Sequence, residues 1–188
     1  MTIVAGLCVA AAVSTLGYWR VHMAASIDSE CVKALQAISS GKLDEWRGLP
    51  AACRRQDAEA VFGASGSDPD GVATLGDAPT AFRDYPPNQV ARQGITVWLA
   101  GDKILSLQVN SPALPVALER VLGRPQAVAA SHLKAFHEQW IYADRGITAH
   151  VDADSHSVLR IYFYAPTTPD AFLASSLSRV ETRRTPRK

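Results

Sequence analysis

A short segment of this sequence occurs twice, and the repetition constrains the fold more than any other feature. Residues 91–96 read ARQGIT and residues 143–148 read ADRGIT. Beyond them, the run ILSL at 104–107 follows the first segment much as VLRI at 158–161 follows the second. Similar segments at matching places along a chain are typical of repeated structural units. We therefore expect two copies of one unit.

Each copy is expected to supply antiparallel strands. In the first copy, apolar residues alternate with others along 95–99, and the chain returns along 104–109. The second copy lies in 140–164, which reads as three strands joined by turn residues. The alternation places Trp98 and His150 at equivalent positions, on the face opposite the aliphatic side chains. Such a face is either covered by another element or used for binding.

Helices are expected before the strands and at the end of the chain. Apolar residues recur at helical spacing in 29–40, 56–62 and 111–122, and a glycine follows each run. A last helix opens at Thr168 and leads into a basic tail. The connection 64–88 is rich in Gly, Asp and Pro and is expected to be a long loop.

Together these elements predict an α+β fold. Its parts are two similar helix-plus-antiparallel-sheet units in tandem at 26–110 and 111–165, an apolar N-terminal helix within 1–25, and a C-terminal helix with its basic tail at 166–188. The aromatic residues Phe82 and Tyr85, at the end of the expected loop, join Trp98 and His150 as candidate contact residues for a partner.

The N-terminal segment indicates export. Residues 2–19 contain no charged side chain and are long enough to span a ~30 Å hydrocarbon layer, with Tyr18 and Trp19 at its interface. The alternative is a secretory signal peptide, although no Lys or Arg precedes the apolar run. Either reading of residues 1–25 delivers the remainder to the periplasmic or extracellular side of a cell envelope.

Cysteine usage agrees with an oxidising compartment. Outside the apolar run only Cys31 and Cys53 remain, and they are suited to one disulfide. The alternative is a pair of unrelated buried thiols. A formal net charge of +1 gives no reason to expect a nucleic-acid partner.

One cluster of residues is compatible with metal chemistry. His150, Asp152, Asp154 and His156 stand at every second position, and on a continuous strand they would share a face suited to a divalent ion. However, Asp-Ala-Asp-Ser is typical of a turn, which would scatter the four side chains. No recognised catalytic motif occurs elsewhere in the chain, so no metal or other cofactor is expected.

The second copy also carries a family resemblance. The segments LGRP at 122–125, WIY at 140–142 and GIT at 146–148, followed by a returning strand, resemble the repeat of beta-lactamase inhibitor proteins and of the SmpA/OmlA group of outer-membrane assembly lipoproteins. The tandem arrangement is more similar to the inhibitors, and the resemblance covers about 49–164. It implies an exported, non-catalytic protein that binds another protein. The chain departs from the lipoproteins in lacking a proper lipid-attachment motif, and from the inhibitors in lacking a disulfide pair within each repeat.

The sequence therefore predicts a non-catalytic protein-binding module of the cell envelope, of an inhibitor, immunity or interaction type. It is expected to meet the membrane through residues 2–19 and to bind another protein. Two alternatives stay open: a metal-dependent hydrolase that uses the His150–His156 cluster, and a structural component of an envelope complex.

Overall fold

The computed structural model describes residues 29–63, 70–75, 78–114 and 117–185. The expected anchor or signal peptide at 2–19 lies outside these residues. Among the described residues, no helix combines the length and the apolar character needed to cross a membrane.

An antiparallel sheet of nine strands organises the described residues, in the order β5-β6-β7-β8-β4-β3-β2-β1-β9. The strands are β1 (Gly71–Leu75), β2 (Ala78–Tyr85), β3 (Ile95–Ala100), β4 (Lys103–Asn110), β5 (Ala127–Ala130), β6 (His137–Tyr142), β7 (Ile147–Asp152), β8 (Val158–Tyr164) and β9 (Val180–Thr185). Strands β1–β4 form one meander and β5–β8 form another, and the two meanders join where β4 pairs with β8. Gln108 and Tyr162 face each other in this joint.

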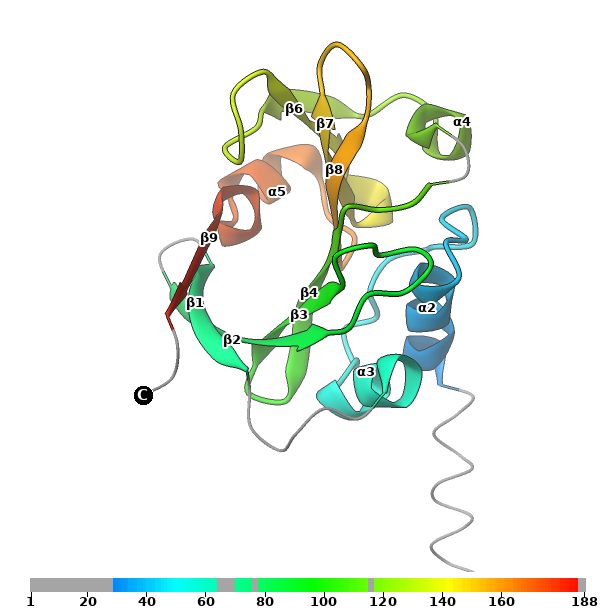
Figure 1. Ribbon diagram of the computed structural model, residues 1–188, viewed down its shortest axis with the longest axis vertical. Coiled ribbons are helices and arrows are strands. Elements are labelled where there is room, and N and C mark those ends of the chain that lie inside the picture. Colours follow the sequence, from blue (N-terminus) through cyan, green and yellow to red (C-terminus); the bar gives the residue numbers. More distant parts are fainter. Residues whose placement is uncertain (1–28, 64–69, 76–77, 115–116, 186–188) are drawn as a thin grey trace, which may run out of the picture.

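The helices cover both faces of the sheet. They are α2 (Glu30–Ser39), α3 (Arg55–Phe62), α4 (Leu118–Leu122) and α5 (Pro169–Ala174), with 3-10 turns η1 (Ala143–Arg145) and η2 (Ser176–Arg179). The sheet is curved, with α2 and α3 outside the curve and α5 inside it (Figure 1). The fold class is therefore α+β, as the sequence predicts.

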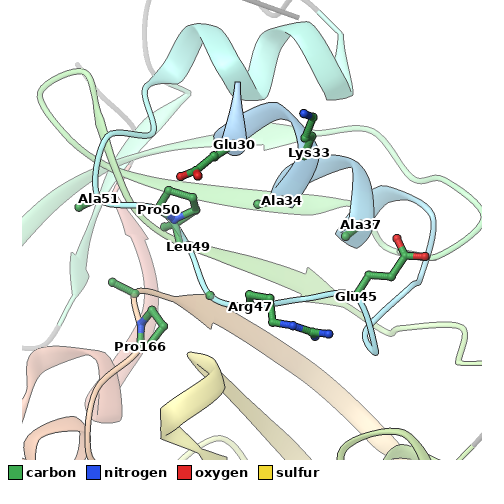
Figure 2. Close-up of a pocket in the computed structure, with 12 residues that line it drawn as sticks. Glu30, Lys33, Ala34, Ala37, Glu45, Arg47, Leu49, Pro50, Ala51 and Pro166 are labelled. Carbon is green, nitrogen blue, oxygen red and sulfur yellow. The ribbon is translucent and has the colours of Figure 1, made fainter. Parts of the chain in front are cut away.

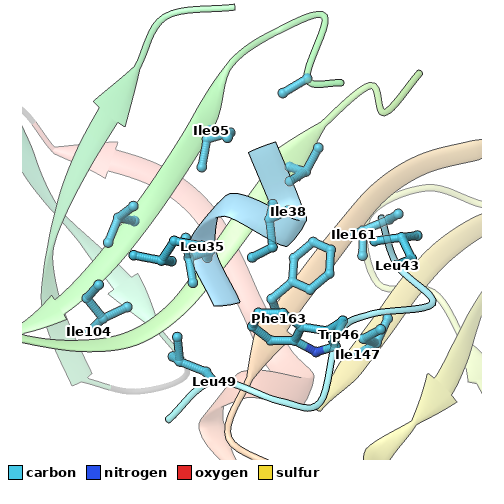
Figure 3. Close-up of a cluster of buried hydrophobic side chains, with 14 of the residues drawn as sticks. Leu35, Ile38, Leu43, Trp46, Leu49, Ile95, Ile104, Ile147, Ile161 and Phe163 are labelled. Atoms are coloured by element: carbon cyan, nitrogen blue, oxygen red, sulfur yellow. The ribbon is translucent and has the colours of Figure 1, made fainter. Parts of the chain in front are cut away.

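The outer face of the sheet carries the larger hydrophobic core, and we call it the aliphatic face. Leu35 and Ile38 of α2 pack there with Trp46, and Figure 3 shows these side chains against those of the strands. The strand residues of the aliphatic face include Ile95, Val97, Leu99, Leu107, Val109, Ile147, Ala149, Val151, Ile161 and Phe163. Helix α2 forms as expected, because the Ser29 hydroxyl accepts a hydrogen bond from the Val32 N–H at 3.1 Å and caps its first turn.

A disulfide links Cys31 to Cys53, with 5.3 Å between their Cα atoms, as the sequence predicts. It fastens α2 to the segment just before α3 and closes one side of the aliphatic core. A disulfide of this kind is typical of a protein that works in an oxidising compartment outside the cytoplasm.

The glycine of each GIT segment has a defined structural task. Gly94 and Gly146 both have a positive φ, of 82° and 62°. A Cβ atom at either position would overlap a backbone carbonyl oxygen, that of Tyr85 beside Gly94 and that of Tyr164 beside Gly146. Only glycine allows both the left-handed backbone and the close approach.

The structure corrects the expected loop at 64–88. This segment contains strand β1 and all of strand β2, each paired on both sides. Gly, Asp and Pro weaken a strand signal in isolation, but pairing with neighbours on both edges overrides a weak local preference. Strand β5 was also not predicted.

Two of the expected helices are shorter than predicted. The helix at 111–122 begins only at Leu118, because the Ser111 N–H donates to Leu159 O and the Ala113 N–H donates to Val90 O. These hydrogen bonds hold the start of the segment against the sheet, so that it does not form a helical turn. At the C-terminus, α5 ends at Ala174, and the basic segment that follows η2 is strand β9, paired with β1.

Candidate functional site

The inner face of the sheet, which we call the polar face, carries both Trp98 and His150. Neither reaches the surface, since Trp98 is 3% exposed and His150 is fully buried. Helix α5 and turn η2 help to cover this face. Phe172 stacks on Tyr164 with 4.9 Å between ring centroids, and Leu177 packs against the same cluster. The sequence left open whether this face is covered by another element or used for binding, and the structure shows that it is covered.

The structure separates the four predicted contact residues. Phe82 lies beside Trp98 on the polar face, with 5.8 Å between ring centroids. Tyr85 lies on the aliphatic face, where its ring is 5.3 Å from that of Phe62. All four, including His150, are buried, so they do not form one exposed contact surface. The physical reason is that 82–85 belongs to a strand and not to a loop.

Buried polar atoms without partners gather on the polar face. Six of them have no hydrogen-bond partner among the described residues: Trp98 Nε1, Ser106 Oγ, Gln108 Oε1, Gln139 Nε2, His150 Nε2 and Arg160 Nε. The strand register connects them, because Trp98 faces Ser106, Gln139 faces His150, and His150 faces Arg160. Buried polar groups in folded proteins are nearly always paired, so this concentration on one face marks it as unusual.

His150 is held in one orientation by the connection between β5 and β6. Its Nδ1 atom lies 2.7 Å from the Ser131 hydroxyl, and the ring of His132 packs edge-on at 5.2 Å. Burial lowers the pKa of His150 to about 3, and the charges of His132, Arg160 and His137 act in the same direction. The imidazole is therefore neutral at physiological pH.

The His150–His156 cluster is not assembled as a metal site. His150 is buried on the polar face, whereas Asp152 closes the β7–β8 turn by accepting hydrogen bonds from Asp154 and Ser155. These bonds, first of all those from Ser155, lower the pKa of Asp152. His156 instead packs on Trp140, on the other face. Within the described residues, no group of three or more His, Cys, Asp or Glu is placed to hold a metal ion.

The connection between β5 and β6, residues 131–136, carries the most exposed large apolar side chain of the described residues. Phe136 is 86% exposed and its backbone is left-handed, with a φ of 62°. Val128, on the edge strand β5, is 53% exposed. Sequence reasoning missed both residues, because it did not predict strand β5, which contains Val128 and precedes Phe136.

An open groove of about 620 Å³ lies on the other side of the molecule, between α2, the segment 45–51 and Pro166. Its floor is formed by small and apolar residues such as Ala34, Leu49 and Pro50, and charged side chains stand on its rim (Figure 2). The unpaired buried atoms described above belong to the polar face and not to the lining of this groove. The groove is therefore separate from the unpaired atoms of the polar face.

Comparison with known proteins gives little that bears on function. No family model matches the chain, and no curated protein matches it. Among solved structures, the chain is similar to a DUF4309 family protein, YjgB, from Bacillus subtilis subsp. subtilis str. 168. The two are 12% identical in sequence, the match covers 72% of this chain and 97% of that chain, and the TM-score is 0.41.

Proposed function

We propose that this chain is an exported, non-catalytic protein-binding module of the cell envelope, and that it contacts its partner through the end of the sheet formed by residues 128–136. The observation that carries the proposal is Phe136, an aromatic side chain almost fully in solvent on a left-handed backbone. The disulfide supports export, and the resemblance to beta-lactamase inhibitor proteins implies the same class of function.

Phe136 contributes little to folding where it stands. An exposed aromatic ring buries almost no apolar area, and a left-handed backbone at a bulky residue costs roughly 1 kcal/mol or more. Strained residues of this kind are concentrated at functional sites. Aromatic side chains are also enriched among the residues that dominate protein interfaces. A role in contacting another protein accounts for both the exposure and the strain.

The edge of the sheet extends this surface. Strand β5 ends the sheet and pairs only with β6 among the described strands, so one side of its backbone faces outward. Its sequence, AVAA, has none of the charged or proline residues that commonly protect an edge from pairing. An extended segment of a partner can therefore add to β5 while Phe136 fills a pocket in that partner.

We further infer that the two meanders are copies of one unit. The register shifts between Trp98 and Leu99 in one copy and between His150 and Val151 in the other, which are equivalent positions. In each half, the threonine of the GIT segment pairs with a residue of the joint, Gln108 in one half and Tyr162 in the other. Recruitment of only one copy, the β5–β8 half, for contact would explain why that half has the exposed aromatic residue.

The test is a pair of substitutions at Phe136, assayed by capture of proteins from envelope extracts. Phe136→Gly removes the ring and relieves the backbone, so we expect unchanged or slightly raised stability together with at least tenfold weaker capture, a loss of about 1.4 kcal/mol. Phe136→Tyr keeps an aromatic ring and should retain most of the capture.

Leu173→Ala is the matched control, because Leu173 is also partly exposed but lies on α5. It should leave capture unchanged. Equal capture by the wild-type chain and by Phe136→Gly would refute the assignment of this surface.

A further inference from the structure

We propose that Gln139, His150 and Arg160 form a recognition site for a carboxylate group. The inference goes beyond protein binding, since the site lies on the polar face and its test needs only the purified chain and small molecules. It rests on the register of three adjacent strands, on three unpaired N–H donors and on one positive charge.

The three side chains are neighbours on one face of the sheet. Gln139 on β6 pairs with His150 on β7, and His150 pairs with Arg160 on β8. Side chains directly opposite each other on antiparallel strands have Cβ atoms roughly 4.5–5.5 Å apart. The trio therefore forms one row across β6, β7 and β8.

Each member of the row offers an unused donor. Gln139 Nε2, His150 Nε2 and Arg160 Nε are buried and have no hydrogen-bond partner among the described residues. Gln139 is 2% exposed and His150 is fully buried, so bulk water does not reach either side chain freely.

We assign His150 the tautomer in which Nε2 carries the proton and Nδ1 accepts from Ser131. The Ser131 hydroxyl accepts a hydrogen bond from the Leu133 N–H at 3.2 Å, and its own proton is then free to point at Nδ1 of His150, 2.7 Å away. A neutral imidazole that accepts at Nδ1 carries its proton on Nε2. His150 is therefore a donor toward the row, and its low pKa keeps it neutral in this role.

The charge of the row selects an anion. Arg160 carries a positive charge, and no ion pair links it to a carboxylate of the described residues. One of its terminal nitrogens donates to the Tyr162 hydroxyl at 3.2 Å, which orients the guanidinium group. A planar guanidinium flanked by two N–H donors matches the two oxygens of a carboxylate.

The row is open at one end. Arg160, Ser131 and Asn110 are half-buried and His132 is exposed, so the row reaches the surface beside the connection 131–136. The residues of α5 and η2 instead pack near Tyr164 and Trp98, further along the polar face. A small carboxylate would enter on the side of His132 and Arg160 and not past α5, and side chains of the connection 131–136 must move to admit it, because the donors of the row are buried.

The experiment follows the thermal unfolding of the purified chain during titration with acetate and succinate, with sodium chloride at matched ionic strength as the salt control. We expect a saturable rise in melting temperature with the carboxylates and none with chloride, because a ligand that binds only the folded state stabilises it. No saturable rise with either carboxylate overturns the proposal. A rise with inorganic phosphate but not with carboxylates overturns the choice of carboxylate.

Variants then locate the site. Arg160→Met and Gln139→Leu should each weaken succinate binding at least tenfold, and Arg160→Lys should bind with intermediate affinity because it keeps the charge without the planar fork. Arg124→Met, at an exposed position away from the row, is the matched control and should bind as the wild type does. Wild-type affinity in both Arg160→Met and Gln139→Leu would place the binding elsewhere and overturn the assignment.

Two further experiments complete the test. One asks whether the carboxylate belongs to a peptide C-terminus, and the other asks whether carboxylate binding and protein binding use separate surfaces. A short peptide with a free C-terminus is compared with its C-terminal amide, so that tighter binding of the free form identifies a chain terminus as a ligand and equal binding excludes it. Phe136→Gly should bind succinate normally, and loss of protein capture in this variant with intact succinate binding shows that the surfaces act separately. Succinate binding in a chain that captures no protein would remove the protein-binding proposal alone.

Discussion

The two faces of the sheet solve the same problem of burial in different ways. On the aliphatic face, Leu107 and Ile147 lie in one hydrophobic cluster with Leu35 and Ile38 of α2 and need no partner beyond close contact. On the polar face, Trp98, His150 and Gln139 are buried equally well, yet each has a nitrogen without a hydrogen-bond partner among the described residues. An unpaired buried donor lowers the free energy of unfolding. We therefore expect stability to come mainly from the aliphatic face, while the polar face keeps groups that folding alone does not favour.

The largest effect is expected on the aliphatic face. Leu35 is fully buried in α2 against the strands, and Leu35→Ala should lower the free energy of unfolding by about 2–5 kcal/mol through lost burial and a residual cavity. Denaturant unfolding measures the change, with the partly exposed Leu173→Ala as the control. A change below about 1 kcal/mol for Leu35→Ala would show that the aliphatic face is not the main source of stability.

Reduction of the disulfide tests how much this covalent link contributes to the stability of the aliphatic core. Cys31 and Cys53 are 22 residues apart, and a loop of this length should contribute about 3 kcal/mol by restricting the unfolded chain. We expect a lower melting temperature in reducing buffer than in oxidising buffer. The double substitution Cys31→Ala and Cys53→Ala should be insensitive to the reductant. Identical melting temperatures of the wild type in the two buffers would contradict this account.

Acid is expected to lower the free energy of unfolding through His150 on the polar face. The pKa of His150 is lowered to about 3 in the folded state, against 6.5 for the unperturbed side chain, so the unfolded state binds the proton more tightly. Stability is therefore complete above pH 6.5 and falls as the pH is lowered from 6.5 toward 3, by up to about 1.4 kcal/mol per pH unit.

The matched variant for this pH effect is His150→Leu, which removes the titrating group. Its free energy of unfolding should depend less on pH between 6.5 and 4.5 than that of the wild type, by roughly 2–3 kcal/mol over the interval. His132, His137 and Arg160 face the imidazole and are unchanged in the variant. Parallel pH profiles of the two proteins would show that another group governs acid sensitivity.

The smallest effect has the opposite sign. Gln139→Leu removes a buried amide whose nitrogen has no partner among the described residues, so we expect the free energy of unfolding to rise by about 1 kcal/mol. Gln108→Leu provides a second case, since Gln108 Oε1 is also unpaired, although the substitution also removes the 2.6 Å bond from its nitrogen to Asn110. Destabilisation by Gln139→Leu would contradict this expectation, because it would show that the amide stabilises the fold.

Local patterns in the sequence predict a large part of this fold. The apolar spacing and the Ser29 cap identify α2, and strict alternation identifies β3, β4 and β7. The strands that were missed are β1, β2, β5 and β9. Their sequences carry a weak local strand signal, and pairing with neighbouring strands decides their structure.

The candidate site could be predicted only in outline. Alternation alone places Trp98 and His150 on a common face, and the structure agrees. Alternation does not predict their burial, because Phe172 of the C-terminal helix shares the cluster of Trp98 and the connection 131–136 packs on His150. The neighbours Gln139 and Arg160 follow from strand register, and the register shifts just after His150, a detail that no single strand's sequence encodes.

The joint between β4 and β8 has a consequence for how the chain matures. Strand β4 is complete at Asn110, but its second partner is not synthesised until residues 158–164. Until then, the edge along Ser106–Asn110 is open in the middle of the future sheet, and open edges pair readily with other chains. A nascent or prematurely terminated chain thus offers the same hydrogen-bonding edge to a second molecule that β8 later occupies. The order of synthesis, and not the finished structure, sets the interval during which this protein is most prone to associate with itself.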